Sequence, residues 1–433
     1  MPTATFVTLG CKVNHYDTQV MREALKKAGY NLVNPDEIAD VYVINTCTVT
    51  SIGDRKSRQI IRRLAALNPD AALVVTGCYA ERRPDEIKNI QNVALVLSNK
   101  DKPFIDKFLN GLINEVQNET GFYPCITSFD DQTRALVKIE EGCDSMCTYC
   151  IVPHVRGCTI RSRPIDSILQ EVQALAKNGY KEIVLTGIHL GAYGKDFTNG
   201  SGLPDVLKAI SAFDGIKRIR LSSIEPMDVS DELINEISRL PKCAHHLHIS
   251  LQSGSDKILR LMRRGYTSSE FENLVNRIRL AIPGVGISTD VMVGFPGETD
   301  QDFAETCDLI SRVRFSRLHV FRYSPREGTP AAKFPDRVPD RVSSKRSDEV
   351  IALGERLLRE FYSGMLGQYA DVLIEDTREG KDNLLAGFTS NYARVLVVDA
   401  TDDLVNSIVN VKLIRLEDDH LIGMQSLKDK IIA

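Results

Sequence analysis

Short apolar runs rich in β-branched residues alternate with longer amphipathic stretches in the first part of the chain. The runs are TFVTLG, VYVINT and ALVVTG, and the stretches between them are YDTQVMREALKKAG and IGDRKSRQIIRRLAAL. The runs, bounded by Gly or Thr, predict strands, and the stretches predict helices. This βαβαβ order implies a parallel sheet, so we expect residues 1–115 to form an N-terminal α/β domain.

The same alternation of strand and helix occurs six times between residues 130 and 345. The predicted strands are ALVKIE, EIVLTG, RIRLSS, HHLHISL, GISTDVMVGF and SRLHVFRYS. Six βα units predict a partial (β/α)6 barrel over residues 130–345, because a closed barrel of this kind has eight. The segment NGLINEVQNETGFYPCITSFDDQTR, from Asn110, lacks sustained periodicity and is interpreted as a connector.

The pattern changes again near the C-terminus. A helix, SSKRSDEVIALGERLLREFYSGMLGQ, leads out of the predicted barrel. The closely spaced strands YADVLIED, LLAGFTS, ARVLVVD and NSIVNVKLIRL follow, with Gly, Asn and Asp between them. This spacing predicts a small five-stranded β-barrel over residues 368–433. The expected fold class is therefore α/β, with a small β-barrel at the end of the chain.

Composition is that of an ordinary globular protein, with 43% hydrophobic and 26% charged residues. Because the chain has no apolar run of about 18 residues and no secretory signal, we expect a cytoplasmic protein. The net charge of −4 argues against broad coating of nucleic acid. The ten cysteines should be mostly reduced in the cytosol, so metal binding or redox chemistry is the better explanation for those that cluster.

Three cysteines each follow a predicted strand of the N-terminal domain. Cys11, Cys47 and Cys78 stand in LGC, NTC and TGC. Parallel strands bring their carboxyl ends to one edge of the sheet, where ligand sites of α/β proteins form. The alternative is three unrelated buried cysteines, since free cysteine is often interior.

Three further cysteines crowd into the loop EGCDSMCTYCIVP, after the first strand of the predicted barrel. They are Cys143, Cys147 and Cys150. Zinc usually takes four protein ligands, and His154 or Cys158 is available as the fourth. A [4Fe–4S] cluster with three cysteine ligands instead keeps one iron open for a small chelating molecule. The spacing favours the cluster over zinc.

The pattern CxxxCxxC after the first strand of a six-unit barrel resembles the radical S-adenosylmethionine (SAM) superfamily. TLGCKVNHYDTQ, INTCTVT and TGCYAE resemble its methylthiotransferase subfamily, and the C-terminal barrel resembles the TRAM domain of that subfamily. The resemblance implies one [4Fe–4S] cluster on the barrel cysteines, whose open iron binds SAM, and a second cluster on the N-terminal cysteines. It also implies the insertion of a methylthio group into an unactivated C–H bond by radical chemistry.

The substrate is also indicated by resemblance. GCKVNHYD, EEGCDSMCTYCIVP and FRYSPREGTPA are most similar to the branch that modifies C2 of N6-threonylcarbamoyladenosine at position 37 of tRNA. Sister branches act on N6-isopentenyladenosine-37 or on an aspartate of a ribosomal protein. The implied partners are tRNA and an electron donor such as flavodoxin or ferredoxin. A hypothesis of a different class is a non-catalytic iron–sulfur or zinc protein that binds RNA.

The resemblance places SAM contacts at the carboxyl ends of the barrel strands, where barrel enzymes carry their chemistry. The expected contacts are Thr186, Gly187, Ser223, Glu225, Gln252, Ser253 and Gly294. A salt bridge or an ordinary glycine-rich turn is the alternative for each of them. His245, His246 and His248 alternate along one strand, and the core of that strand explains them better than a metal does.

A basic segment follows the fifth predicted strand of the barrel. Residues 312–346 hold ten Lys or Arg against three Asp or Glu. The segment is interpreted either as a solvated surface or as a phosphate-binding patch for RNA. The expected phosphate contacts are Arg322, Arg326, Arg337, Arg341, Lys345 and Arg346.

Overall fold

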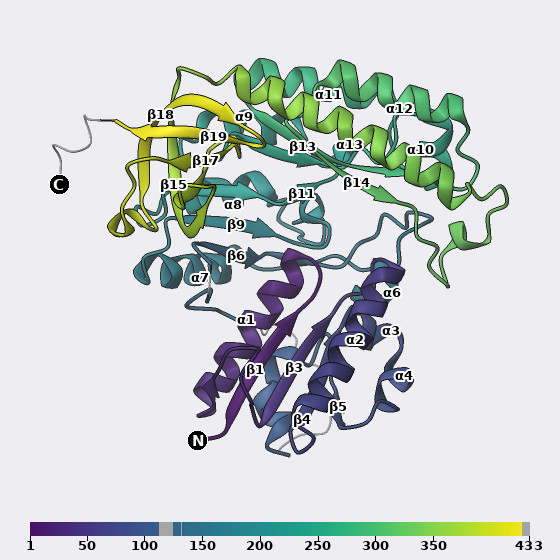
Figure 1. Cartoon of the computed structure of the whole chain (residues 1–433), viewed down its shortest axis with the longest axis vertical. Helices are drawn as coiled ribbons and strands as arrows, with labels where there is room; N and C mark the ends of the chain where they lie inside the picture. The colour runs from purple at the N-terminus through teal and green to yellow at the C-terminus, as the bar shows by residue number, and fades with distance from the viewer. Residues whose placement is uncertain (112–123, 131, 427–433) are drawn as a thin grey trace.

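The computed structural model describes residues 1–433 except 112–123, 131 and 427–433. Figure 1 shows an N-terminal α/β part, a central part in which helices cover one face of the strands, and a small C-terminal β-barrel. This arrangement confirms the predicted fold class. The predicted connector lies partly outside the described residues.

A parallel five-stranded sheet with the order β2-β1-β3-β4-β5 forms the N-terminal part. Its strands are β1 (Thr3–Thr8), β2 (Asn31–Leu32), β3 (Val41–Thr46), β4 (Ala72–Gly77) and β5 (Val93–Val96). Its helices are α1 (Lys12–Lys27), α2 (Ser51–Leu67), α3 (Cys78–Arg82), α4 (Pro84–Lys88), η1 (Lys102–Phe104) and α5 (Ile105–Leu109). Alternate residues of β3 belong to two apolar clusters, one on each face of the sheet, which explains its uninterrupted apolar character.

The central part contains two sheets, joined by a bridge between Ile219 and Cys243. One has the order β10-β9-β6, and the other has the order β11-β12-β13-β14. The strands are β6 (Arg134–Lys138), β9 (Glu182–Thr186), β10 (Arg218–Leu221), β11 (Ser223–Ile224), β12 (His246–Ile249), β13 (Gly286–Val293) and β14 (Arg317–Arg322). All six predicted strands are present, and the third is divided into β10 and β11.

Helices cover the outer face of these strands (Figure 1). They are α7 (Ile165–Lys177), α8 (Leu203–Ser211), α9 (Asp231–Arg239), α10 (Asp256–Met262), α11 (Ser268–Ala281), α12 (Asp300–Val313) and α13 (Asp340–Ser363). A short hairpin, β7 (Glu140–Glu141) and β8 (Arg161–Ser162), flanks the loop of the second cysteine group, which ends in α6 (Val152–Arg156).

The two faces of the central strands differ in polarity because side chains alternate along a strand. The apolar residues Ile183, Ile219, Leu247 and Ile287 pack with the helices in the largest apolar cluster. The opposite face, which we call the inner face, is largely polar. It carries Arg134, Lys138, Glu182, Thr186, Arg218, Arg220, His246, His248, Ser288, Asp290, Arg317 and His319. His246 is buried on this inner face and His248 is partly buried there, so both lie outside the apolar cluster beneath the helices.

The C-terminal part is a closed five-stranded barrel with the order β15-β16-β17-β19-β18. Its strands are β15 (Tyr369–Glu379), β16 (Leu384–Thr389), β17 (Arg394–Val397), β18 (Ile408–Glu417) and β19 (His420–Gln425). Closure pairs every strand on both sides, so the barrel has no free edge. None of the helices in the described ranges is long and apolar enough to cross a membrane.

Buried arginines attach this barrel to the amino ends of β6, β9 and β10. Arg218 donates to the carbonyl oxygens of Phe388 and Asp371 at 3.0 and 2.9 Å. Arg220 donates to those of Thr389 and Ser390, each at 3.1 Å. Both guanidinium groups also pair with Glu182, at 3.1 and 2.7 Å. The barrel therefore lies at the end of the strands opposite to the cysteine loop.

Glu182→Gln keeps the shape of this side chain and removes the charge between the two arginines. We expect the free energy of unfolding to fall by about 3–5 kcal/mol, because buried charges lose their partner. Urea denaturation of the intact chain measures the change.

Glu272→Gln is the matched control, because Glu272 pairs at 3.1 Å with Arg312, whose side chain is 54% exposed. Exposed ion pairs contribute only about 0–1 kcal/mol. If both substitutions lowered the free energy of unfolding equally, the buried interaction of Glu182 with the two arginines would contribute no more to stability than an exposed ion pair.

Candidate active site

The three N-terminal cysteines lie at the carboxyl edge of three neighbouring strands. Cys11 is the N-cap of α1 and follows β1, Cys47 directly follows β3, and Cys78 opens α3 directly after β4. Burial, followed by the charges of Cys78 and Cys11, raises the pKa of Cys47 to about 11. The strand order thus brings the three thiols to face one another, as the sequence predicts.

Glycines before two of these cysteines allow the close approach of the strands. Gly10 has a φ of 106°, and a Cβ atom there would lie 3.0 Å from Sγ of Cys47. Gly77 has a φ of 92°, and its Cβ would lie 2.4 Å from the carbonyl oxygen of Thr46. Any other residue would push the strand ends apart, which explains the glycines in LGC and TGC.

The second cysteine group lies in the loop between β7 and α6. Burial, followed by the charges of Cys147 and Cys143, raises the pKa of Cys150 to about 12. Within the described residues, no group of three or more His, Cys, Asp or Glu side chains has the arrangement that holds a single metal ion.

Arg264 connects this loop to Glu225, one of the predicted SAM contacts. Its guanidinium lies 3.4 Å from Sγ of Cys147 and pairs with Glu225. It also donates to the carbonyl oxygen of Ser250 at 3.2 Å. The Arg264 side chain is 2% exposed, so it is a fixed cation beside the cysteine loop. The sequence contains no motif that singles it out.

A buried histidine contacts the same loop from the other side. Nε2 of His189 lies 2.6 Å from Asp228, and Nδ1 lies 3.2 Å from Asp144 and 3.8 Å from Sγ of Cys143. Burial alone would lower the pKa of His189, but the hydrogen bonds to Asp228 and Cys143 raise it to about 10. His189 is thus a second basic side chain in contact with the loop, and the sequence analysis did not identify it.

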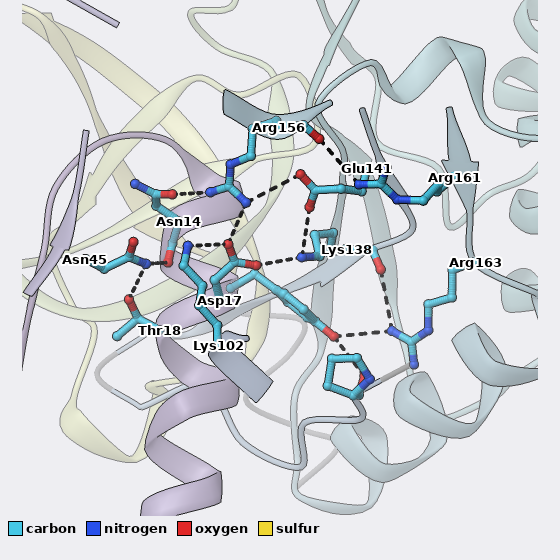
Figure 2. Close-up of polar contacts among 12 residues, drawn as sticks. Asn14, Asp17, Thr18, Asn45, Lys102, Lys138, Glu141, Arg156, Arg161 and Arg163 are labelled. Atoms are coloured by element: carbon cyan, nitrogen blue, oxygen red, sulfur yellow. Dashed lines mark hydrogen bonds and ion pairs between the residues drawn. The ribbon is translucent and has the colours of Figure 1, made fainter. Parts of the chain in front are cut away.

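A buried ionic network joins the N-terminal part to the central part, as Figure 2 shows. Asp17 of α1 pairs with Lys102 at 2.9 Å, with Lys138 at 2.6 Å and with Arg156 at 2.8 Å. Burial alone would raise the pKa of Asp17, but the three cations hold it well below its usual range. Glu141 accepts from Lys138 and Arg156 at 3.1 and 3.4 Å. Three cations therefore meet two carboxylates.

Arg156 links this network to both cysteine groups. Its Nε lies 3.4 Å from Sγ of Cys78, and its guanidinium also donates to the side chain of Asn14 (Figure 2). Its partner Glu141 is two residues before Cys143. The positively charged Arg156 thus lies beside the thiol of Cys78 in the first cysteine group. Its ion pair with Glu141 also holds the chain just before the loop of the second cysteine group.

Four of the predicted SAM contacts lie at or just beyond the ends of strands of the central part. Thr186 and Gly187 end β9 beside Glu140, Ser223 begins β11, and Gln252 turns the chain after β12 with a φ of 66°. Two other positions have partners inside the protein. The hydroxyl of Ser253 is 3.2 Å from that of Thr306. The amide of Gly294 donates to Glu298 at 3.0 Å.

Two of the predicted phosphate contacts are buried in ion pairs. Arg326 pairs with Asp54 at 2.6 Å, and Arg346 pairs with Glu298 at 2.5 Å. Both residues are at most 5% exposed, so neither side chain is available to RNA. Arg322, Arg337, Arg341 and Lys345 are exposed.

Family models match two parts of the chain. Residues 3–98 match a model described as uncharacterized protein family UPF0004. Residues 137–310 match the radical SAM superfamily. The radical SAM methyltransferase TsrM of Kitasatospora setae has a similar fold, with a TM-score of 0.56 and 14% identity, over 76% of this chain and 77% of that one. The fold and the cysteine loop thus define a radical SAM protein with an additional N-terminal cysteine site.

Curated relatives specify the family further. The threonylcarbamoyladenosine tRNA methylthiotransferase MtaB of Bacillus subtilis is 42% identical over 96% of this chain and 94% of its own length. MtaB of Thermotoga maritima is 42% identical over 87% of each chain. The tRNA-2-methylthio-N(6)-dimethylallyladenosine synthase of Acetivibrio thermocellus is 33% identical over 94% of this chain and 87% of its own. The chain belongs to the radical SAM tRNA methylthiotransferase family.

Asp17→Asn tests the network that joins the two cysteine groups. The substitution leaves three buried cations without their shared carboxylate, which costs about 3–5 kcal/mol. For a chain of this size we expect a fall in the apparent Tm of roughly 3–6 °C, measured by calorimetry.

Asp70→Asn, at an exposed position of the same domain, serves as the control and should leave the Tm unchanged. An unchanged Tm for Asp17→Asn would mean that the network does not hold the two parts together.

Proposed function

We propose that this protein adds a methylthio group to C2 of N6-threonylcarbamoyladenosine at position 37 of tRNA. The observation that carries the proposal is one buried network that contacts Cys78 of the first cysteine group through Arg156 and includes Glu141, two residues before Cys143 of the second group. This arrangement suits a reaction that needs two cofactors at one site. The threonylcarbamoyl substrate is supported by the relatives named for it, which are 42% identical, against 33% for the relative named for the dimethylallyl substrate.

We propose that Cys11, Cys47 and Cys78 hold one [4Fe–4S] cluster, and that Cys143, Cys147 and Cys150 hold another. The residues fit such groups, because each cysteine group is a set of neighbouring thiols, in which the charge of one would raise the pKa of another, beside a buried arginine. Each thiolate of a cluster binds a different iron, so its ligands need not converge on one point. Hydrogen bonds to the sulfurs, here from Arg156 and Arg264, tune the potential of a cluster.

A cluster on the second cysteine group, when bound, supplies the electron that cleaves SAM to a radical able to remove hydrogen from an unreactive C–H bond. The chain's own residues bind and orient SAM. Glu225 accepts hydrogen bonds from the hydroxyl or amino groups of SAM, and the buried Arg264 holds the Glu225 carboxylate in position. Thr186, Gly187, Ser223 and Gln252 remain the proposed contacts along the strand ends.

The proposed macromolecular partner is tRNA, and the proposed source of electrons is a donor such as flavodoxin or ferredoxin in the cytoplasm. The exposed residues Arg322, Arg337, Arg341 and Lys345 are the proposed phosphate contacts. Nucleotide 37 stands in a single-stranded loop, so its base is removed from the stack at low energetic cost.

The substrate is tested by expressing the chain in a bacterial strain whose tRNA contains N6-threonylcarbamoyladenosine but not its 2-methylthio form. Mass spectrometry of the nucleosides should show this nucleoside with one hydrogen replaced by a methylthio group. The triple Ala variant at Cys143, Cys147 and Cys150 is the control and should give none. Methylthiolation of the dimethylallyl nucleoside alone would reject the proposed substrate.

The two cysteine groups are tested separately by iron content. Anaerobically prepared protein should hold about eight irons, and either triple Ala variant about four. The variant at Cys11, Cys47 and Cys78 should still cleave SAM when reduced, but form no methylthio product. Stoichiometric zinc without acid-labile sulfide would contradict both assignments.

A further inference from the structure

The inner face of the central strands carries a group of histidines that the proposed reaction has not used. His246 and His248 of β12 both lie against Ser288 of β13, with ring nitrogens 2.9 and 3.0 Å from its hydroxyl. Nε2 of His248 lies 3.3 Å from Asp290, and the ring centroids of His248 and His319 are 5.5 Å apart. The strand register pairs His248 with Ser288 and Asp290 with His319, at neighbouring positions across β12, β13 and β14, and we call this group of residues the row.

Two ring nitrogens of this group have no hydrogen bond to any described residue: Nδ1 of His246 and Nε2 of His248, although the latter lies 3.3 Å from Asp290. His246 is 5% exposed. A buried polar atom without a partner is costly unless water or a ligand supplies one. In contrast, His319 is exposed on the edge strand β14. The group is therefore buried at His246 and accessible to solvent at His319.

Cations surround the row. Arg134 and Arg220 lie over the ring of Tyr392, at 5.4 and 4.6 Å from its centroid, and this ring packs on His246 at 4.7 Å. Lys12, the exposed first residue of α1, acts electrostatically on His246, His319 and Tyr392. Burial alone would raise the pKa of Tyr392, but Arg134, Arg220 and Lys12 lower it. An acidic group placed on this face is therefore favoured in its anionic form.

Lys12 also connects the row to the proposed chemistry, because it directly follows Cys11. The chain therefore connects the first cysteine group directly to a residue whose charge acts on the row. A nucleoside whose base lies near the cysteines would direct its N6 substituent along this face.

We propose that Lys12, His248 and His319 are specificity-determining residues that bind the carboxylate of the N6-threonylcarbamoyl group on the inner face. This inference rests on the proposed function. Lys12 supplies the charge, and the imidazole N–H groups donate to the carboxylate or the urea oxygen. Asp290 accepts from the hydroxyl or N–H groups of the same substituent.

The alternative substituent, a dimethylallyl group, does not suit this face. It has no charge and no hydrogen-bonding group, so it would desolvate the histidines and Asp290 without replacing their bonds to water. Sites built for polar contacts reject apolar analogues strongly for this reason. The polar inner face therefore gives the chain a physical means of distinguishing the two modified adenosines.

The test compares the binding of three anticodon stem–loop RNAs to the iron-loaded protein under anaerobic conditions. They carry at position 37 either N6-threonylcarbamoyladenosine, its neutral methyl ester or N6-dimethylallyladenosine. The wild-type protein should bind the free acid about tenfold or more tightly than the ester, which is the usual contribution of a charge-assisted hydrogen bond.

Lys12→Met and His319→Leu should each reduce this acid-to-ester ratio to about threefold or less, with affinity for the ester RNA unchanged. Lys12→Arg keeps the charge and should retain the ratio. Lys56→Met and His420→Leu, at an exposed lysine of α2 and a histidine of the C-terminal barrel, are matched controls and should not change it. Iron content is measured for every variant, because Lys12 is adjacent to Cys11.

The outcomes separate this inference from the proposed function. Equal binding of acid and ester by the wild type overturns carboxylate recognition. The wild type could prefer the acid while the variants lose the same factor of affinity for all three RNAs. In that case the assigned residues do not bind the carboxylate, although the proposed function stands. If the wild type prefers and methylthiolates the dimethylallyl RNA, the proposed function fails and this inference fails with it.

Discussion

The desolvated carboxylate of Asp17 is the constraint on which the relative placement of the two cysteine groups depends. A buried charge is tolerated only when its partners are in place, and the partners of Asp17 come from η1 of its own domain and from β6 and α6 of the central part. The N-terminal sheet therefore docks in one register only. Because α1 carries Asp17 and begins directly after Cys11, the same contact fixes Lys12, whose charge acts on His246 and His319 of the inner face.

The fold was predictable where the local signal is strong. Long β-branched runs bounded by glycine identify β1, β3, β4 and the strands of the central part. The two-residue strand β2 and the short edge strand β5 are too brief for a periodic pattern. β19 was not among the predicted strands, although the number of strands in the barrel was correct. The division of RIRLSS at Ser222 reflects the change from one sheet to the other, which no local pattern encodes.

The candidate site was predictable only where the ligand residues form a motif. The six cysteines follow strands or stand at close spacing, so the sequence reveals them. Arg156 and Lys102 are separated from their ion-pair partner Asp17 by 139 and 85 residues along the sequence. No local sequence pattern predicts pairs so far apart. Composition misassigned Arg326 and Arg346, because a count of charges does not distinguish a buried ion pair from an exposed patch.

The attachment of the C-terminal barrel has a consequence for how this family diverges. Arg218 and Arg220 bind four carbonyl oxygens of the barrel, and every residue type presents a carbonyl oxygen. Mutations at those barrel positions therefore leave these four bonds in place as long as the backbone keeps its path. The arginines and Glu182 constrain one another through their side chains, whereas these four bonds place no requirement on the barrel side chains at the same positions. The C-terminal barrel can thus acquire a new outer surface without a matching change in the domain that carries it.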